Sequence, residues 1–222
     1  MTPEEAVAEQ LRLAPSVVPR AAEGFAPRVA AGLDVAYDGD RLVAAAACVD
    51  IETGERLDSA VVEGRTAFPY VPGLFAYREL PALRDALAAL PASPDVLICD
   101  GHGIAHPRRF GLACHLGVVT GIPAVGVAKN PLGEYSPPAR ERGSWTPLTL
   151  DADEVGRALR TQDGVKPVFV SVGHLIDIDT ATGLVLRLAR RHRQPETTRA
   201  ADHLCRAASV RTPGPRSRPA GG

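Results

Sequence analysis

Three acidic residues stand in surroundings that disfavour a lone carboxylate. Asp34 interrupts the apolar segment VAAGLDVAY, Asp100 ends the apolar segment DVLICD, and Glu79 lies in a stretch of helical character between them. Because a carboxylate loses its hydration in an apolar strand, we expect it to be paired or bound to a cation. Carboxylate oxygens favour Mg²⁺ or Mn²⁺, and such an ion activates water and neutralises charge in phosphodiester hydrolysis. Taken singly, each residue could instead cap a turn or bind backbone N–H groups.

Lys129 and Asp202 extend this candidate site. Lys129 is one of only two lysines among the 25 basic residues, the other being Lys166, and it ends an apolar run. A compact ammonium there could contact a phosphate as a point charge, although a lysine at a strand end is ordinarily a surface residue. Asp202 falls on a predicted helix, where it could supply a fourth ligand or simply be solvated.

Gly, Pro and other turn residues divide the chain into elements that must position these side chains. A helix is predicted over 3–13, because Pro and acidic residues occupy its first turn. Three strands separated by the turn sequences DGD and ETG are predicted over 29–37, 41–50 and 56–64 as an antiparallel meander. The following elements are a helix over 74–90 that Pro81 either bends or divides, a buried parallel strand over 95–100, a helix over 109–120, a strand over 123–129, mixed strand and loop to 172, and helices over 180–191 and 196–208.

This order of elements is that of ribonuclease H-like folds, in which a mixed sheet of three antiparallel strands and then parallel strands is flanked by helices. In such a sheet the first and fourth strands are neighbours, so Asp34, Glu79 and Asp100 would meet at one edge. A fold analogy assigns no chemistry by itself. We predict one α/β catalytic domain over 1–207 and a disordered tail rich in Pro, Arg and Gly over 208–222.

Charge and composition narrow the classes of partner. The formal net charge is −1, yet residues 1–100 carry 8 basic and 16 acidic side chains, whereas residues 101–222 carry 17 basic and 10 acidic ones. This division is compatible with a basic surface that meets a polyanion. The longest apolar run, 42–49, has eight residues and is too short to span a membrane. Four widely spaced cysteines are typical of buried, reduced thiols, so we expect a cytoplasmic protein.

Histidines near Asp100 offer a different metal chemistry. His102, His106 and His115, together with Cys114, have a spacing that can occur in zinc sites. The adjacent aspartate and the HPRR sequence favour hydrogen bonding or phosphate contact by these histidines over zinc binding.

Five segments resemble the endonuclease V family, in the same order along the chain. They are GLDVAY (32–37), AFPYVPGLFAYRE (67–79), VLICDGHGIAHPRRFGLACHLG (96–117), GIPAVGVAKNPL (121–132) and QPETTRAAD (194–202). The resemblance covers about residues 3–207. It implies Mg²⁺-dependent cleavage, with Mn²⁺ as a substitute, of the second phosphodiester bond on the 3′ side of a hypoxanthine (inosine) nucleotide, leaving 3′-hydroxyl and 5′-phosphate ends.

Matched motif positions imply roles for the acidic residues and the lysine. Asp34, Glu79 and Asp100 resemble the family's metal ligands, and Lys129 resembles a group near the reacting phosphate. Asp202 occupies a position that the family fills with His or Asp, which implies an outer or second-metal ligand.

The resemblance also implies residues that bind nucleic acid. Tyr70, between Pro69 and Pro72, resembles a wedge that fills the gap left by an extruded base; the alternative is a tyrosine that packs in the core. Glycine backbone groups can approach such a base closely and could distinguish the O6 and N1–H of hypoxanthine from adenine. The remaining candidates are Gly73, Gly101, Gly103 and Gly111 for this pocket, and Arg108, Arg109 and Arg199 for the phosphate backbone, unless these arginines are merely solvated.

The expected partner is DNA containing deoxyinosine, with inosine-containing RNA as an alternative, and we expect a monomer that binds no membrane. Two other functions remain open from the sequence. One is a different ribonuclease H-like nuclease that acts on RNA or branched substrates, and the other is a catalytically silent nucleic-acid-binding module. Cleavage that ignores inosine would favour the first, and loss of a carboxylate would favour the second.

Overall fold

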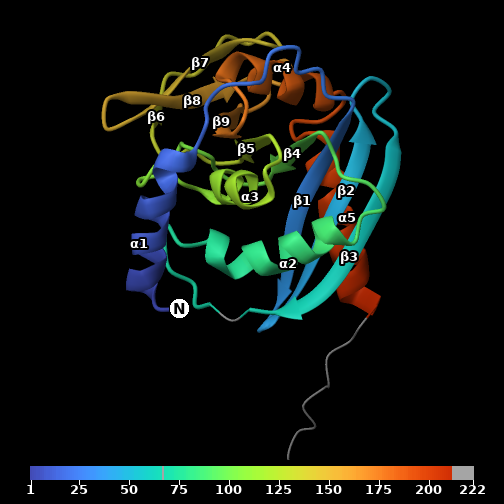
Figure 1. Cartoon of the computed structure of the whole chain (residues 1–222). Coiled ribbons are helices and arrows are strands. Elements are labelled where there is room, and N and C mark those ends of the chain that lie inside the picture. The colour runs from blue at the N-terminus through green and yellow to red at the C-terminus, as the bar shows by residue number, and fades with distance from the viewer. Residues whose placement is uncertain (67, 212–222) are drawn as a thin grey trace, which may run out of the picture.

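A mixed sheet of nine strands organises the computed structural model, which describes residues 1–66 and 68–211 (Figure 1). β1 (Val29–Asp38), β2 (Arg41–Asp50) and β3 (Arg56–Arg65) form an antiparallel meander. β4 (Val96–Cys99) pairs in parallel with β1, and β5 (Ala124–Ala128) pairs in parallel with β4. The sheet then continues through antiparallel neighbours, namely β9 (Val168–His174), β8 (Asp153–Leu159), β7 (Trp145–Leu150) and β6 (Glu134–Tyr135).

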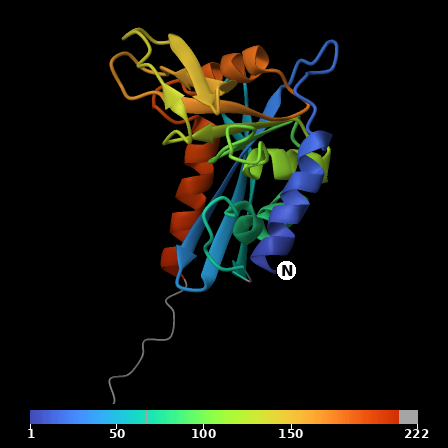
Figure 2. The same cartoon turned by 90° about the vertical axis from the view of Figure 1, so that its left-hand side faces the viewer.

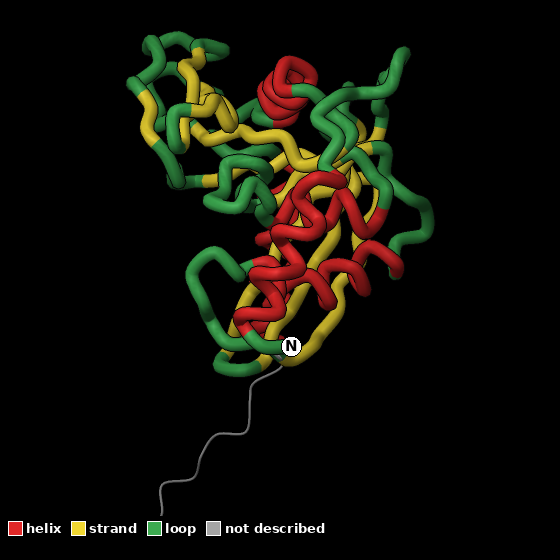
Figure 3. The backbone as a smooth tube through the Cα atoms, turned by 60° about the vertical axis from the view of Figure 1, so that its left-hand side comes forward, coloured by secondary structure: helices red, strands yellow, loops and turns green. Residues whose placement is uncertain are grey.

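Helices cover both faces of this sheet. α2 (Ala76–Ala88) and α3 (Leu112–Thr120) pack on one face, and α4 (Ile178–Leu188) and α5 (Glu196–Arg211) pack on the other. α1 (Pro3–Leu13), which runs into the short 3₁₀ helix η1 (Ala14–Ser16), lies on the opposite side of the sheet from α5 (Figure 2). Loops join the strands at the β6–β8 end, whereas helices cover the part of the sheet that contains β1 (Figure 3).

Both faces bury apolar side chains because residues alternate along the central strands. In β4, Leu97 and Cys99 belong to the core cluster under α2 and α3, whereas Val96 and Ile98 belong to the cluster under α4. A strand buried on both sides reads as a continuous apolar run in sequence, which is the pattern that predicted it.

The close approach of α5 to β1 depends on a glycine. A Cβ atom at Gly32 would overlap the backbone of Thr197, at the first turn of α5. Because Gly32 has no side chain, the helix can lie directly against the strand that carries Asp34. α5 also carries Asp202, so this contact brings two of the predicted site residues onto neighbouring elements.

The predicted α/β architecture is confirmed, with a mixed sheet flanked by helices. Pro81 lies inside one continuous helix, α2, so it does not divide the segment. The region predicted as mixed strand and loop folds as β6 to β9. α5 continues to Arg211, beyond the predicted start of the tail, and the rest of the tail lies outside the described residues. The extent of the single domain stays a prediction.

All four cysteines are buried and unpaired, as predicted. No helix in the described part of the chain is both long enough and apolar enough to cross a membrane.

Candidate active site

Three neighbouring strands of the sheet deliver predicted site residues at the same end. Asp34 follows Leu33, the last residue of β1 that pairs with β4, while Asp100 follows β4 and Lys129 follows β5. Because parallel strands end at the same edge of a sheet, these side chains share one neighbourhood. The charges of Asp100, Asp202 and Lys129 all act on Asp34.

Glu79 joins this group from the first turn of α2. It is 4% exposed, and its Oε1 accepts a hydrogen bond of 3.0 Å from the hydroxyl of Tyr37 on β1. Burial raises the pKa of Glu79 to about 8, and the nearby charges of Asp34 and Asp100 add to the rise. The buried environment of Glu79 therefore disfavours the ionised form of its carboxyl group.

Asp34 has the same electrostatic character. Burial raises its pKa to about 7, and repulsion from Asp100 and Asp202 contributes further. The positive charge of Lys129 opposes this rise only in part. Two clustered acids with raised pKa values are a signature of sites that bind a cation or transfer a proton.

Each remaining carboxylate has a partner within the protein. Lys129 Nζ forms an ion pair with Asp100 Oδ2, and Arg206 Nε donates to Asp202 Oδ1 at 2.8 Å. Across residues 1–66 and 68–211, no three His, Cys, Asp or Glu side chains are arranged as a preformed metal site. The carboxylates share one neighbourhood without converging on a single point.

The donor set nevertheless fits a hard divalent cation. Asp34, Glu79 and Asp100 offer oxygen ligands with no histidine among them, which is the chemistry that Mg²⁺ and Mn²⁺ prefer. A cation would also offset the burial and mutual repulsion that raise the pKa values of Asp34 and Glu79.

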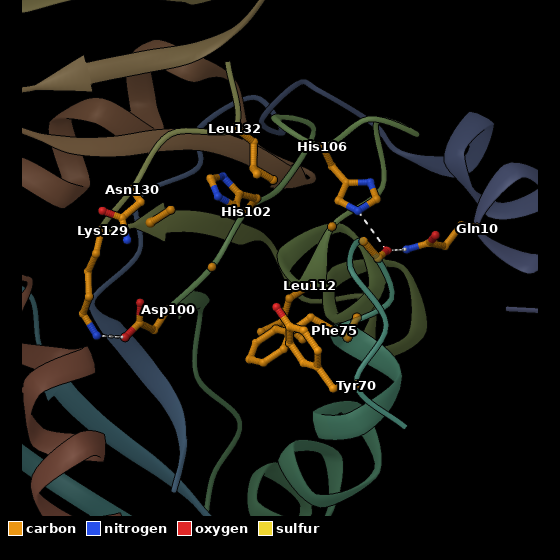
Figure 4. A pocket seen from close by; sticks show the side chains of 15 residues that line it. Gln10, Tyr70, Phe75, Asp100, His102, His106, Leu112, Lys129, Asn130 and Leu132 are labelled. Atoms are coloured by element: carbon orange, nitrogen blue, oxygen red, sulfur yellow. Dashed lines mark hydrogen bonds and ion pairs between the residues drawn. The ribbon is translucent and has the colours of Figure 1, made fainter. Parts of the chain in front are cut away.

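A cavity of about 440 Å³ opens beside these charges. Asp100 and Lys129 lie at one end of it, and Tyr70 and Phe75 lie over another part, near Leu112 (Figure 4). Apolar side chains and glycine backbone with a few polar groups are typical of a ligand site. The volume is adequate for a base.

The loop that carries Tyr70 ends in a tight turn. Leu74 N–H donates to Val71 O at 2.9 Å, Pro72 occupies the second position, and Gly73 has φ +78° in the third. These are the features of a type II turn, which needs Gly at its third position. Tyr70 is 70% exposed, so a role in core packing is wrong for it, and Pro69 beside it is also exposed.

The predicted pocket glycines divide into two groups. Gly73, Gly101 and Gly111 line the cavity, whereas Gly103 does not. Gly103 packs against β9, where a Cβ atom would overlap Val172 O, and its N–H donates to Ser171 Oγ at 2.8 Å. Its absent side chain therefore serves the close packing of a loop on a strand.

The predicted phosphate-binding arginines make contacts within the protein. Arg108 Nη2 donates to Gly73 O at 2.7 Å. Arg109 Nη2 donates to Leu150 O at 2.8 Å and to Asp153 at 2.9 Å. Arg199 is paired with Glu196 at 3.8 Å and remains exposed, so it keeps a charge available at the surface.

The histidines and Cys114 do not form a zinc site among the described residues. His106 binds Gly73 O, and His115 packs against the rings of Tyr77 and Phe110. Cys114 lies against Val172 O. His102 lines the cavity, with burial lowering its pKa to about 4, so its imidazole is neutral.

Several residues of the site carry little signal in the sequence. Tyr37 holds Glu79 from β1, and only its place in the GLDVAY segment hinted at a role. The other residues that line the cavity and were not predicted are Gln10, Phe75, Ala76, Leu112, Ala128, Asn130 and Leu132.

The chain is similar in sequence and in fold to known proteins. Residues 10–203 match the sequence model of the family described as Endonuclease V. An endonuclease V from Nocardia farcinica is 56% identical over 211 residues, covering 93% of this chain and 92% of the relative. The crystal structure of endonuclease V from Streptomyces avermitilis has a TM-score of 0.90 at 53% identity, covering 95% of this chain and 94% of that one.

A more distant structure has a similar fold. Endonuclease V from Ciona intestinalis, solved in complex with a 24mer DNA containing an inosine followed by a ribo-adenosine, has a TM-score of 0.83 at 24% identity, covering 94% of this chain and 98% of that one.

Proposed function

The chain belongs to the endonuclease V family, and from this premise we propose that it cuts inosine-containing DNA at the second phosphodiester bond on the 3′ side of the hypoxanthine nucleotide. The products carry 3′-hydroxyl and 5′-phosphate ends. One observation carries the proposal, namely that Asp100 and Lys129 line one end of a cavity that Tyr70 also lines, while the charge of Asp100 acts on Asp34 and Glu79.

Asp34, Glu79 and Asp100 are the residues that would hold Mg²⁺, or Mn²⁺ in its place, with Asp202 as an outer ligand. Bound there, the ion would lower the pKa of the attacking water and neutralise charge on the phosphate. The hydroxyl of Tyr37 would orient the Glu79 carboxylate for this role through its hydrogen bond to Oε1.

Lys129 acts on the substrate in this proposal. Its ammonium, paired with Asp100 in the free protein, turns to a phosphate oxygen when the nucleic acid binds. Burial alone would lower the pKa of Lys129, but the bond to Asp100 and the surrounding acidic charge raise it. The group therefore stays protonated and donates to the phosphate as a cation.

The cavity receives the extruded base. Backbone groups at Gly73, Gly101 and Gly111 can approach the base edge closely because no Cβ stands before them. The Tyr70 ring is exposed and lies close to the turn at Gly73. It fills the gap in the base stack from which the hypoxanthine base has been extruded. Arg199 contacts the phosphate backbone from α5.

Inosine in DNA is the substrate that we favour, because the distant relative from Ciona intestinalis was solved with such a DNA. Inosine-containing RNA is the second candidate, since that DNA carries a ribonucleotide after the inosine. The enzyme acts as a monomer in the cytoplasm, where its four unpaired thiols stay reduced.

The deciding experiment compares four oligonucleotides, DNA and RNA with and without one inosine, at a stated salt concentration and with Mg²⁺ or chelator. We expect Mg²⁺-dependent cuts in the inosine substrates only. Cutting that ignores inosine would instead identify a different nuclease. Binding without cutting would identify a silent binding module. Asp34→Ala should lower cleavage by more than roughly 100-fold while it leaves binding largely intact.

A further inference from the structure

The carbonyl of Gly73 is surrounded by side-chain donors. Gln10 Nε2 lies 3.1 Å from this oxygen, His106 Nε2 lies 3.0 Å from it, and Arg108 Nη2 lies 2.7 Å from it. Figure 4 shows the His106 and Gln10 side chains directed at the loop, with dashed lines to this oxygen. A backbone carbonyl oxygen has two lone pairs. Three donors on one such oxygen are therefore more than its lone pairs can each accept singly, and they restrain its position from three directions.

The three donors are also joined to one another. Arg108 Nε donates to Gln10 Oε1, and Gln10 Nε2 reaches Phe110 O at 3.1 Å in addition to Gly73. His106 Nδ1 accepts from the Arg108 N–H at 3.2 Å, so the proton of the neutral ring is on Nε2, where it can be donated to Gly73. Burial lowers the pKa of His106 to about 4, and the charge of Arg108 lowers it further. The ring is therefore a fixed donor at neutral pH.

The Gly73 carbonyl belongs to the turn that follows Tyr70. The other side of the loop has its own anchor, because Arg78 Nη1 donates to Phe68 O at 3.0 Å. The exposed Tyr70 thus stands between two fixed backbone carbonyls, although the ring itself is free of the core.

Gln10 is unusual for its helix. It is 1% exposed, whereas a glutamine is ordinarily a surface residue. Burying an amide is unfavourable unless its hydrogen bonds are made, and here they are made to Gly73, Phe110 and Arg108. α1 also packs Ala6 against Phe68 and Leu74, on either side of Tyr70.

We propose that Gln10, with His106 and Arg108, forms a clamp on the Gly73 carbonyl that positions Tyr70 over the cavity. Gln10 is a positioning residue, since it acts through the tyrosine, and Arg108 serves the clamp rather than the phosphate backbone. This inference rests on the proposed function, because the action of Tyr70 on a base stack belongs to that proposal. Gln10 also lines the cavity, so a direct contact with the base is the competing interpretation.

The first measurement needs no substrate. Gln10→Met keeps the length of the side chain and removes its hydrogen bonds. We expect faster hydrogen–deuterium exchange in a peptide covering 70–75, above all at Leu74 N–H, with unchanged exchange in β1 and α5. Thr182→Val is the matched control, because it removes a buried hydroxyl that donates to Ile178 O at 2.6 Å and accepts from Arg157 Nη1 at 3.3 Å, on the other face of the sheet.

The second measurement is a double-mutant cycle with Tyr70. Gln10→Met should lower kcat/KM on an inosine duplex roughly ten-fold, the order expected for losing buried hydrogen bonds. In a Tyr70→Ala background the same change should alter kcat/KM by less than about two-fold, since coupled residues are not additive. Thr182→Val should leave both backgrounds unchanged.

Equal losses in the two backgrounds would overturn the clamp, because Gln10 would then touch the base itself or act through folding. Unchanged exchange at 70–75 would overturn it as well. If the wild type fails to cut inosine duplexes, the proposed function is wrong, and exchange in the substrate-free protein still decides the clamp. If thermal melting finds Gln10→Met unfolded, Gln10→Glu, which keeps an acceptor for Arg108 but loses the donors, takes its place in both measurements.

Discussion

The ammonium of Lys129 forms an ion pair with the carboxylate of Asp100 where the parallel strands β5 and β4 end side by side. Without a substrate, the protein thus neutralises one of its clustered acids with its own cation. The ion pair also fixes the position of the Lys129 ammonium at one end of the cavity. Under the proposed function, Lys129 turns from Asp100 to a phosphate oxygen when the nucleic acid binds.

Replacing Lys129 tests this exchange. Lys129→Met keeps the length of the side chain and removes its charge, so we expect kcat on an inosine duplex to fall roughly 100-fold, as for other lost charge contacts in a transition state. Single-turnover cleavage measures the rate. Lys166→Met is the matched control, because Lys166 is the only other lysine and is exposed. Equal rates for the two variants would remove Lys129 from the reaction.

The carboxylates predict how stability depends on pH. Asp34 and Glu79 have pKa values of about 7 and about 8 in the folded protein, above the values near 4 expected after unfolding. Between pH 4 and pH 8 the folded state therefore binds more protons than the unfolded state. For this reason the free energy of unfolding falls as the pH rises through the two folded pKa values, about 7 and about 8. In chelator, Tm should be lower at pH 8.5 than at pH 5.5.

Mg²⁺ should restore Tm mainly at the higher pH, because ligand oxygens must be deprotonated to bind it. The control is the Asp34→Asn/Glu79→Gln variant, whose Tm should change much less over the same pH range and should not respond to Mg²⁺. A wild-type Tm that ignores both pH and Mg²⁺ would contradict the electrostatic description of this site. Thermal melting by circular dichroism is sufficient for all of these comparisons.

Removing the Tyr70 side chain is expected to lower cleavage without lowering the stability of the fold. Because its ring is 70% exposed, Tyr70→Ala should leave Tm unchanged. Base–aromatic stacking is worth about 1–3 kcal/mol, so cleavage at inosine should fall roughly ten-fold or more. Tyr70→Phe keeps the ring and should retain most of the activity. Full activity of Tyr70→Ala in steady-state assays would exclude a wedge.

Two cavity glycines predict opposite outcomes on substitution by alanine. At Gly101 a Cβ atom would meet only the Leu112 side chain at 3.6 Å, an ordinary contact. Gly101→Ala should therefore fold with an unchanged Tm while the narrowed cavity cuts inosine poorly. At Gly111 the Cβ atom would overlap His102 O, so Gly111→Ala should lower Tm. If both variants melt like the wild type, the close packing of Gly111 against His102 is wrong.

Much of the fold could be predicted because the central strands are buried on both faces and read as apolar runs bounded by turn residues. β2 begins and ends at the predicted residues. β6 to β9 were harder to predict, since a two-residue strand at 134–135 and Pro147 inside β7 give no clear alternation. The interior position of Pro81 in α2 was equally open, because proline both starts and bends helices.

The candidate site was predictable where a charged side chain interrupts an apolar strand, as at Asp34, or directly follows one, as at Asp100. It was not predictable where function depends on contacts between distant segments. Nothing in the sequence around Gln10 indicates that its amide reaches Gly73 and Phe110. Nor does the sequence indicate that Arg108, which was predicted to bind phosphate, donates to the Gly73 carbonyl.

The placement of α1 also has a consequence for biosynthesis. Gln10 is separated by 63 residues from Gly73 and by 100 residues from Phe110. Contacts between such distant residues form slowly, because the entropy cost of closing a chain loop grows with its length. The residues of α1 therefore leave the ribosome long before Gly73 and Phe110 do. The sheet strands β1 to β3 can pair while the Tyr70 loop still lacks these contacts, which are complete only after synthesis has passed residue 110.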